Sequence, residues 1–305
     1  MSKGDSPSLW KQIKRDRVML LLAAPGVLVL LLFAYVPLLG NVIAFQDYLP
    51  FLGIAESPFV GFENFTRMFD DPAFWHAVKN TIVLTVIQLV FYFPIPIALA
   101  LLINSVIHSK VRSFVQSAVY LPHFISWVII VALFQQMLGE SGPGRDALDA
   151  IGMTEFQPLS DPDFFKWLVA IQVTWKDAGW GAIIFLAALL SIDDNLYEAA
   201  AMDGAGRWQR FWHITLPGIL PVAMVLLILR LGTALSVGFE QILLQRDAVG
   251  ARAAEVLDTY VYFEGVVGGQ WGVSAAAGLI KGIVGTIVVI ATNRMAKAMG
   301  QRGIY

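Results

Sequence analysis

The chain has 305 residues, of which 57% are hydrophobic and only 14% are charged. Soluble domains carry about 25% charged residues, so most of this chain must face lipid or other apolar helices, which predicts an all-α integral membrane protein. The net charge of −2 disfavours a nucleic-acid binder, and the absence of cysteine excludes a disulfide framework or a thiolate metal site.

Six apolar runs are long enough to cross a bilayer, which takes about 20 residues for each span. They cover residues 18–39, 81–103, 114–138, 167–190, 219–244 and 272–292. The first run follows a basic segment but exceeds the roughly 7–15 apolar residues of a signal peptide, so we interpret it as a retained span. We therefore expect an N-terminal segment over residues 1–17, a six-span domain over residues 18–298 and a tail over residues 299–305.

Basic residues are distributed unevenly between the two sides of the membrane. The segments on the side of the N-terminus hold twelve Lys and Arg residues, and the loops on the opposite side hold six. Because basic residues concentrate in cytoplasmic loops, we expect both termini in the cytoplasm. The outer loops are longer and acidic, with Pro and Gly turn signals, and we expect small structured caps there.

Motifs for catalysis and nucleotide binding are absent from the sequence. No Lys follows a Gly, so the chain has no Walker A motif, and it has neither His-Glu-x-x-His nor Gly-x-Ser-x-Gly. The four histidines lie far apart in the sequence, and we interpret each as an interfacial or packing residue. We expect a chain that is not an enzyme and that binds no metal, ATP or other cofactor itself.

The link between the fourth and fifth spans, residues 191–217, carries the strongest local pattern. Asn195 is placed as an N-cap, with Glu198 three residues later as in a capping box, and Gly204 as the end of a short helix. A second helical stretch over residues 208–214 has aromatic side chains suited to the membrane interface, and Pro217 opens the fifth span. These residues alone are equally compatible with an ordinary interfacial elbow.

Glu-Ala-Ala, then Asp-Gly-Ala and then Ile-x-Leu-Pro, at this spacing, resembles the EAA loop of permeases in binding-protein-dependent ABC importers. The matching residues are Glu198, Ala199, Ala200, Asp203, Gly204, Ala205, Phe211, Ile214, Leu216, Pro217 and Pro221. In that family the loop forms a coupling helix that enters a cleft on the ATPase subunit. The resemblance implies a type I ABC importer permease fold, with the first six of these residues in ATPase coupling.

Other segments resemble the carbohydrate branch of this family that takes up polysaccharide fragments. They are residues 44–48, 60–65, 120–127, 238–241 and 258–262. The broader class is similar to the larger permease subunit of the maltose importer, without its extra N-terminal spans and large periplasmic domain. The resemblance implies an oligosaccharide substrate, the bacterial inner membrane, a second homologous permease, two subunits that bind ATP and Mg²⁺, and an extracytoplasmic solute-binding protein.

Charged residues inside a span are costly, so they face a cavity or pair with one another. Lys176 and Asp177 are expected near the outer end of the fourth span, and Arg230 and Lys281 lie in the fifth and sixth. A sugar path needs polar partners for hydroxyl groups and flat apolar faces for the rings. The candidate path residues are Trp175, Asp177, Trp180, Arg230, Thr233, Ser236, Glu240 and Lys281.

Structural roles are the alternative for these residues. The tryptophans could form an aromatic belt, Lys176 could snorkel, and Glu240 could pair with Arg230 or Lys281 to hold spans together. An ion-coupled secondary sugar transporter is the alternative function, and it would favour inverted repeats and paired carboxylates at the middle of the membrane. A receptor-like or scaffolding membrane protein is a further alternative.

Overall fold

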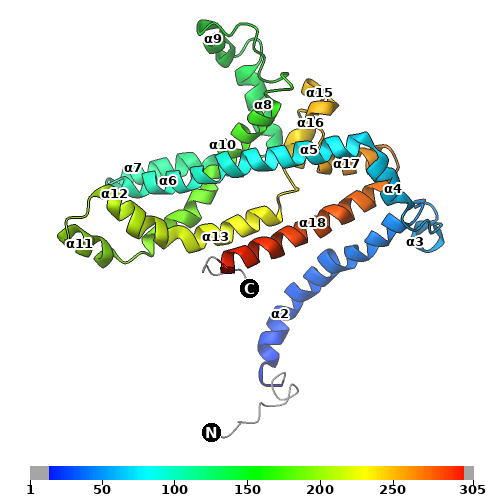
Figure 1. Cartoon of the computed structure of the whole chain (residues 1–305), viewed down its shortest axis with the longest axis horizontal. Coiled ribbons are helices and arrows are strands. Elements are labelled where there is room, and N and C mark those ends of the chain that lie inside the picture. The colour runs from blue at the N-terminus through cyan, green and yellow to red at the C-terminus, as the bar shows by residue number, and fades with distance from the viewer. Residues whose placement is uncertain (1–13, 299–305) are drawn as a thin grey trace.

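The computed structural model describes residues 14–298, which form helices joined by turns (Figure 1). Within that range it has one isolated antiparallel bridge, between Gln46 and Phe59. The predicted tail over residues 299–305 and most of the predicted segment over residues 1–17 lie outside the described residues. The helical architecture confirms the predicted all-α fold.

Five continuous helical segments of the described chain are long and apolar enough to cross a membrane. Two of them are single helices, α10 (Phe165–Leu190) and α18 (Trp271–Ala298). The segment Arg17–Phe45 consists of α2 (Arg17–Leu30), η1 (Leu31–Tyr35) and η2 (Val36–Phe45), and Pro72–Ser105 consists of α5 (Pro72–Ile87), η3 (Gln88–Tyr92) and α6 (Pro94–Ser105). The segment Arg207–Gly232 consists of α12 (Arg207–Arg210), η5 (Phe211–Thr215) and α13 (Leu216–Gly232). A bent pair passes the same test: α7 (Ser109–Tyr120) with η4 (Leu121–Phe124), then α8 (Trp127–Leu138). With that pair taken as one span the total is six, as predicted.

A bend of 107° interrupts the third predicted span, residues 114–138. Pro122 lies in the 3₁₀ turn η4, Ile125 is extended, and Ser126 caps α8 by accepting a hydrogen bond from the backbone N–H of Ile129. The run is apolar throughout, but a proline followed by a serine N-cap ends one helix and begins another. The third span is therefore a bent pair of helices.

The fifth predicted span, residues 219–244, is wrong at both ends. The helix begins at Arg207 and ends at Gly232, and turns and irregular backbone follow. Gly238 then has a φ of 105°, a left-handed conformation that residues with a side chain rarely adopt. The short helix α14 (Phe239–Leu243) comes next, so Glu240 does not lie on the span.

The remaining helices have no more than nine residues each. On the predicted outer side they are α3 (Gly53–Glu56), α4 (Glu63–Asp70), α9 (Pro143–Ala150), α14, α15 (Arg246–Val249), α16 (Ala251–Ala254), α17 (Leu257–Tyr262) and η6 (Phe263–Val267). On the predicted cytoplasmic side, α11 (Asp194–Met202) lies at the opposite end of the molecule from α3 and α4 (Figure 1). The outer loops thus form small helical caps.

The helix α10 is central to the fold and packs against α5, α6, α7 and α13. Its buried side chains include Phe165 and Phe185, which lie in two separate apolar clusters. Gly179 lets α7 come close, because a Cβ at this position would lie 1.9 Å from the carbonyl oxygen of Val119. Lipid is as apolar as these side chains, so close van der Waals packing and polar contacts hold such helices together.

Three buried glutamines fix α14 against α10. The side-chain oxygen of Gln172 accepts hydrogen bonds from the amides of Gln241 (2.7 Å) and Gln245 (3.0 Å), and its own amide donates to Gln245 (3.0 Å). The amide of Gln241 also donates to the backbone carbonyl of Val169. This network holds α14 inside the fold after the chain leaves α13.

Replacing Gln172 with Leu is expected to loosen this attachment. Leucine keeps the volume but removes the acceptor that two buried amides share, so each amide keeps only one of its two hydrogen bonds. An unsatisfied buried group costs about 1–3 kcal/mol in proteins generally. We expect a lower melting temperature for the purified transporter complex, measured beside the matched variant Gln135→Leu on the exposed side of α8. Equal melting temperatures for the two variants would contradict a stabilising role for the network.

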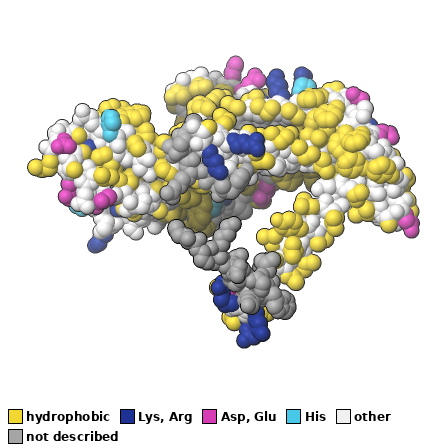
Figure 2. Space-filling view, turned by 60° about the horizontal axis from the view of Figure 1, so that its bottom comes forward, with side chains coloured by type: hydrophobic (Ala, Val, Ile, Leu, Met, Phe, Trp, Pro, Cys, Tyr) yellow, Lys and Arg dark blue, Asp and Glu magenta, His cyan; other side chains and the backbone are white. Residues whose placement is uncertain are grey.

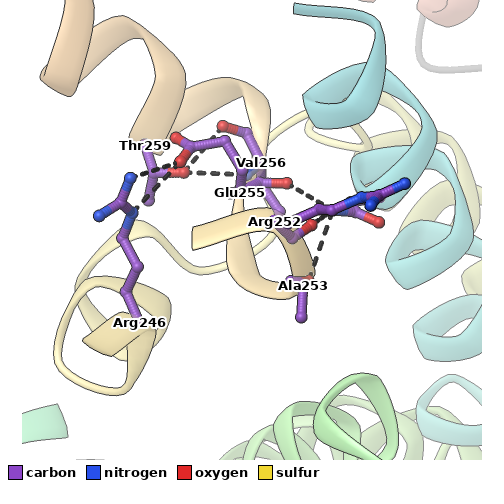
Figure 3. Close-up of polar contacts among 7 residues, drawn as sticks. Arg246, Arg252, Ala253, Glu255, Val256 and Thr259 are labelled. Carbon is purple, nitrogen blue, oxygen red and sulfur yellow. Dashed lines mark hydrogen bonds and ion pairs between the residues drawn. The ribbon is translucent and has the colours of Figure 1, made fainter. Parts of the chain in front are cut away.

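Polar contacts fasten the outer segment after α14 to α5 (Figure 3). Arg246 donates two hydrogen bonds to one carboxylate oxygen of Glu255, at 2.8 and 3.2 Å, and its guanidinium lies 3.8 Å from the ring centre of Phe263. The Asn80 side chain of α5 donates to the backbone carbonyls of Arg252 (3.2 Å) and Glu255 (2.9 Å). The outer segment after α14 is therefore attached to the span that contains α5.

Glu264 of η6 lies beside this cap. Burial raises the pKa of its carboxyl group, and the carboxylates of Asp71 and Glu255 raise it further. Because the folded-state pKa exceeds the unfolded one, ionised Glu264 destabilises the fold above the raised pKa, and this penalty disappears as the pH falls below the unfolded value. Glu264→Gln should therefore raise the melting temperature of the complex more at neutral than at acid pH. The control is Glu140→Gln at an exposed site, and the same pH profile for both variants would contradict the prediction.

The helix α2 stands apart from the rest of the fold (Figure 1). None of its residues is buried, and Figure 2 shows apolar side chains covering this arm. The last part of the same span, η2, packs against α18. An apolar helix with this exposure needs lipid or another protein around it.

Candidate functional site

The predicted coupling residues lie on α11 and on the turn that follows it. The side chain of Asp193 caps the helix by accepting a hydrogen bond from the backbone N–H of Asn195 (2.9 Å), so the predicted N-cap at Asn195 is wrong by two residues. Asp193 precedes the helix as its N-cap, and Asp194 is the first helical residue. Glu198 is consequently in the second turn, where its side chain is exposed.

Gly204 ends α11, as predicted. Its φ is +79°, its N–H donates to the carbonyl of Ala201 (3.1 Å), and the N–H of Ala205 donates to the carbonyl of Ala200 (2.8 Å). These two bonds form a Schellman motif, in which a left-handed glycine satisfies the last carbonyls of a helix. The turn is therefore defined by backbone geometry.

No residue of α11 is buried, which makes the helix an exposed surface at one end of the molecule. Figure 2 shows acidic side chains gathered at this end. The apolar side chains of Leu196 and Met202 are also exposed, Met202 to 88%. Exposed large apolar side chains beside charged ones are typical of a protein interaction site.

One hydrogen bond links α11 to the fifth span. The hydroxyls of Tyr197 and Thr215 lie 2.9 Å apart, and Thr215 is buried in η5. The predicted second helical stretch, residues 208–214, continues without interruption into α13, so Pro217 does not open the span but lies ten residues inside it. Its missing N–H is tolerated because η5 changes the hydrogen-bond pattern just before it.

A second group of polar side chains lies halfway along Pro72–Ser105 and α10, and Arg230 joins it from the end of α13 through Gln88. Gln88 is the seventeenth of the 34 residues of Pro72–Ser105, and Asp177 is the thirteenth of the 26 residues of α10. We call this group the midspan polar layer. It consists of Gln88, Tyr92, His123, Lys176, Asp177 and Arg230. The predicted position of Lys176 and Asp177 near the outer end of their span is therefore wrong.

Lys176 holds the break in the third span. Its ammonium donates to the backbone carbonyls of His123 (2.7 Å) and Ile125 (2.5 Å), lies 3.5 Å from that of Pro122, and is 5.6 Å from the ring centre of Trp127. The side chain is buried, so it does not snorkel to the membrane surface. Its charge is used to satisfy the carbonyls at the end of η4.

His123, which the sequence assigned to packing, belongs to the layer. Its Nδ1 lies 2.8 Å from a carboxylate oxygen of Asp177, and its ring stacks on Trp180 with centroids 4.5 Å apart and planes 6° apart. Trp180 remains 45% exposed, so the stack offers a flat aromatic face. Trp175 instead packs against Phe134 of α8 and is not part of this face. The sequence held one sign of this role, because His123 lies in segment 120–127, which resembles the carbohydrate branch of the family.

Arg230 approaches the layer from the end of α13. It donates a hydrogen bond to the side-chain oxygen of Gln88, and its guanidinium carbon lies 5.5 Å from the ring centre of Tyr92. The Tyr92 hydroxyl in turn lies 3.5 Å from the backbone carbonyl of Asp177. These contacts connect α13, η3 and α10 at one level.

Neither predicted pairing of Glu240 occurs in the described part of the chain. Lys281 forms an ion pair with Asp258 of α17, and Arg230 bonds to Gln88. Glu240 is exposed on α14, and its side chain forms no ion pair or hydrogen bond with a described residue. Because α13 ends at Gly232, Glu240 lies on the separate helix α14 and not on the span of Arg230.

A groove of about 510 Å³ runs between the end of α13, α17 and α18. Its polar lining includes Thr233, Ser236 and the pair Asp258–Lys281, and glycines of α18 widen one side. Thr233 and Ser236 also line a small cavity beside Arg230. The structure thus brings Arg230, Thr233, Ser236 and Lys281 to adjoining cavities. It places Trp180 and Asp177 at the same level as Arg230, and Trp175 and Glu240 elsewhere.

Comparison with known proteins gives consistent likenesses. Residues 92–301 match the family described as binding-protein-dependent transport system inner membrane component. A Bacillus subtilis protein named polygalacturonan/rhamnogalacturonan transport system permease protein YteP is 45% identical over 97% of this chain and 96% of its own length. Protein LplB of the same organism is 41% identical over 100% of this chain and 96% of its own length.

A solved structure has the same fold along nearly the whole chain. It is a bacterial alginate ABC transporter in complex with alginate pentasaccharide-bound periplasmic protein. One of its chains is 38% identical to this one, with a TM-score of 0.89, and the match covers 98% of this chain and 100% of that chain.

Proposed function

This chain belongs to the family of binding-protein-dependent transport system inner membrane components, and we propose that it is a permease subunit through which an oligosaccharide released from a polysaccharide crosses the membrane. The observation that carries this proposal is the groove lined by Thr233, Ser236 and the pair Asp258–Lys281, which adjoins the cavity at Arg230 of the midspan polar layer. The relatives named for polygalacturonan, rhamnogalacturonan and alginate support a polysaccharide fragment as the substrate.

ATP hydrolysis belongs to separate subunits in this proposal. Two ATP-binding partners hold ATP and Mg²⁺, and α11 enters a cleft on one of them, with Glu198 as polar anchor and Gly204 as the turn. The exposure of α11 and its Schellman motif support this role. Closure of the ATPases turns the substrate cavity outward, and hydrolysis resets it.

A second permease encloses the path from the other side. The groove is open, and α2 has no buried residue of its own, so both features accept a partner helix. A further groove of about 600 Å³ between η2 and α18, which reaches Leu38 and Ile287, lies on the same side of α18 as the first span. An extracytoplasmic binding protein docks on the outer caps and delivers the sugar.

The ion-coupled alternative has no support in the comparisons, and the layer is poorly suited to it. The carboxylates of the described midspan region and groove each pair with a basic side chain, Asp177 with His123 and Asp258 with Lys281. A proton or sodium relay would favour carboxylates that face one another.

The proposal is tested by reconstituting this chain in lipid vesicles with its copurified permease, ATPase and binding-protein partners. We expect uptake of oligosaccharides that requires ATP and the binding protein. Uptake by this chain alone, without ATP, would contradict the proposal. Failure to retain any ATPase on purification would also contradict it.

A further inference from the structure

We propose that Arg230 recognises a carboxylate group of the substrate, so that the permease selects acidic oligosaccharides over neutral ones. This inference rests on the proposed oligosaccharide transport and assigns a chemical class to its substrate. The recognition point is the guanidinium where the small cavity beside η3 meets the groove along α18.

The charge of Arg230 is uncompensated within the described chain. Its hydrogen-bond partner is the neutral amide oxygen of Gln88, its aromatic neighbour is Tyr92, and it forms no ion pair with a described residue. A cation at this depth is costly unless it meets an opposite charge or a water-filled cavity. The other two intramembrane cations differ, because Lys281 pairs with Asp258 and Lys176 binds three backbone carbonyls.

The guanidinium has donors left for a ligand. Arginine carries five N–H donors in a planar fork that matches a carboxylate with two parallel bonds. The structure uses one of these donors for a side chain, that of Gln88. This fixes one edge of the guanidinium and leaves the rest of the fork available.

A substrate can approach this fork from the groove. The cavity beside Arg230 holds about 10 Å³, the space of roughly one water molecule, and is lined by Thr85 and Gln88 together with Thr233 and Ser236. The last two residues also line the groove of about 510 Å³, a volume typical of small-ligand sites. A sugar in the groove would reach Arg230 with a carboxylate through this cavity.

The charge balance of the layer points the same way. Lys176 binds backbone carbonyls, and the carboxylate of Asp177 contacts His123, so neither gives Arg230 an opposite charge. A substrate carboxylate would supply that charge. A neutral sugar would leave Arg230 desolvated and unpaired.

A structural role for Arg230 makes a different prediction. The residue lies in the last turn of α13, where a cation is favourable to the helix dipole. If that were its whole role, its replacement would affect acidic and neutral substrates alike. The ratio between the two substrate classes therefore separates recognition from helix stabilisation.

The test is ATP-dependent uptake by vesicles that contain the complete complex. The probes are trisaccharides of galacturonate, mannuronate and glucuronate, each compared with its own carboxyl-reduced, neutral form. We expect the wild type to favour at least one acidic member by about tenfold or more, as for a charge-assisted hydrogen bond. Arg230→Gln should collapse this ratio toward one, Arg230→Lys should give an intermediate ratio, and the control Arg252→Gln, at an exposed outer site, should preserve it.

The outcomes are distinguishable. A wild type without preference for any acidic member would overturn the inference and leave the proposed function intact, provided that neutral oligosaccharides are taken up. An unchanged ratio in assembled Arg230→Gln or Arg230→Lys complexes would also overturn it, and retained ATPase subunits report assembly. Absence of ATP-dependent uptake of every oligosaccharide, acidic or neutral, would overturn the proposed function as well.

Discussion

Gly204→Ala is expected to reduce ATP-driven uptake about tenfold while the chain remains in the membrane. The φ of +79° at Gly204 is unfavourable to any residue with a Cβ by roughly 1–2 kcal/mol, and a factor of ten corresponds to about 1.4 kcal/mol. A Cβ there would meet no atom within 4 Å, so the effect must come from the backbone conformation and not from a clash. The Schellman turn would open and α11 would lose its defined end.

The loop contains a matched control. Gly206 lies two residues later with a φ of −71°, and a Cβ there would come no closer than 3.8 Å to the Gln209 side chain. Gly206→Ala should therefore leave uptake near the wild-type level. The measurement is uptake per assembled complex, with the amount of copurified ATPase recorded. Equal activity of the two variants would show that the turn at Gly204 has no part in coupling.

Lys176→Met is expected to have the larger effect on assembly. Methionine fills similar space but donates no hydrogen bond, so the buried carbonyl of Pro122 and the partly buried carbonyls of His123 and Ile125 lose their donor. Each unsatisfied buried group costs about 1–3 kcal/mol, and the total is a large fraction of the stability of a typical domain. We expect little assembled complex to survive purification, and a strongly lowered melting temperature for what remains.

A lysine on the same helix provides the comparison. The side chain of Lys166, in the first turn of α10, forms no hydrogen bond or ion pair with a described residue, and Lys166→Met should be tolerated. Lys176→Arg keeps the charge and the donors and should recover part of the yield. If Lys176→Met matched Lys166→Met in yield and melting temperature, the ammonium would not be what stabilises the bend.

Local signals predicted the parts of the structure that depend on neighbouring residues. The helix α11 ends at Gly204 because a glycine in a left-handed conformation is a short-range requirement. The six apolar runs follow from composition because each one has to cross lipid. For these features the sequence contains the whole physical cause.

Features that depend on residues far apart in the sequence were not predictable in this way. The end of α13 at Gly232 is invisible to hydropathy, because α14 is held by Gln241 and Gln245 through Gln172, about 70 residues earlier. Similarly, Lys281 pairs with Asp258 because α17 folds back against α18. The fifth apolar run, residues 219–244, instead suggested Glu240 as the partner of Lys281. A lone histidine gave no sign that His123 would meet a carboxylate more than 50 residues away.

The helix from Arg207 to Gly232 is continuous, so the fifth span can act as a lever. Arg230 lies 23 residues from the start of this helix, a distance of about 35 Å at 1.5 Å per residue. The hydroxyl of Tyr197 on α11 contacts this helix near its start, at the hydroxyl of Thr215. A tilt of about 5° there would displace the guanidinium by about 3 Å, roughly the length of one hydrogen bond. A small push at the cytoplasmic end would thus be enough to make or release a bond to cargo at the centre of the membrane, without any relay of side chains between them.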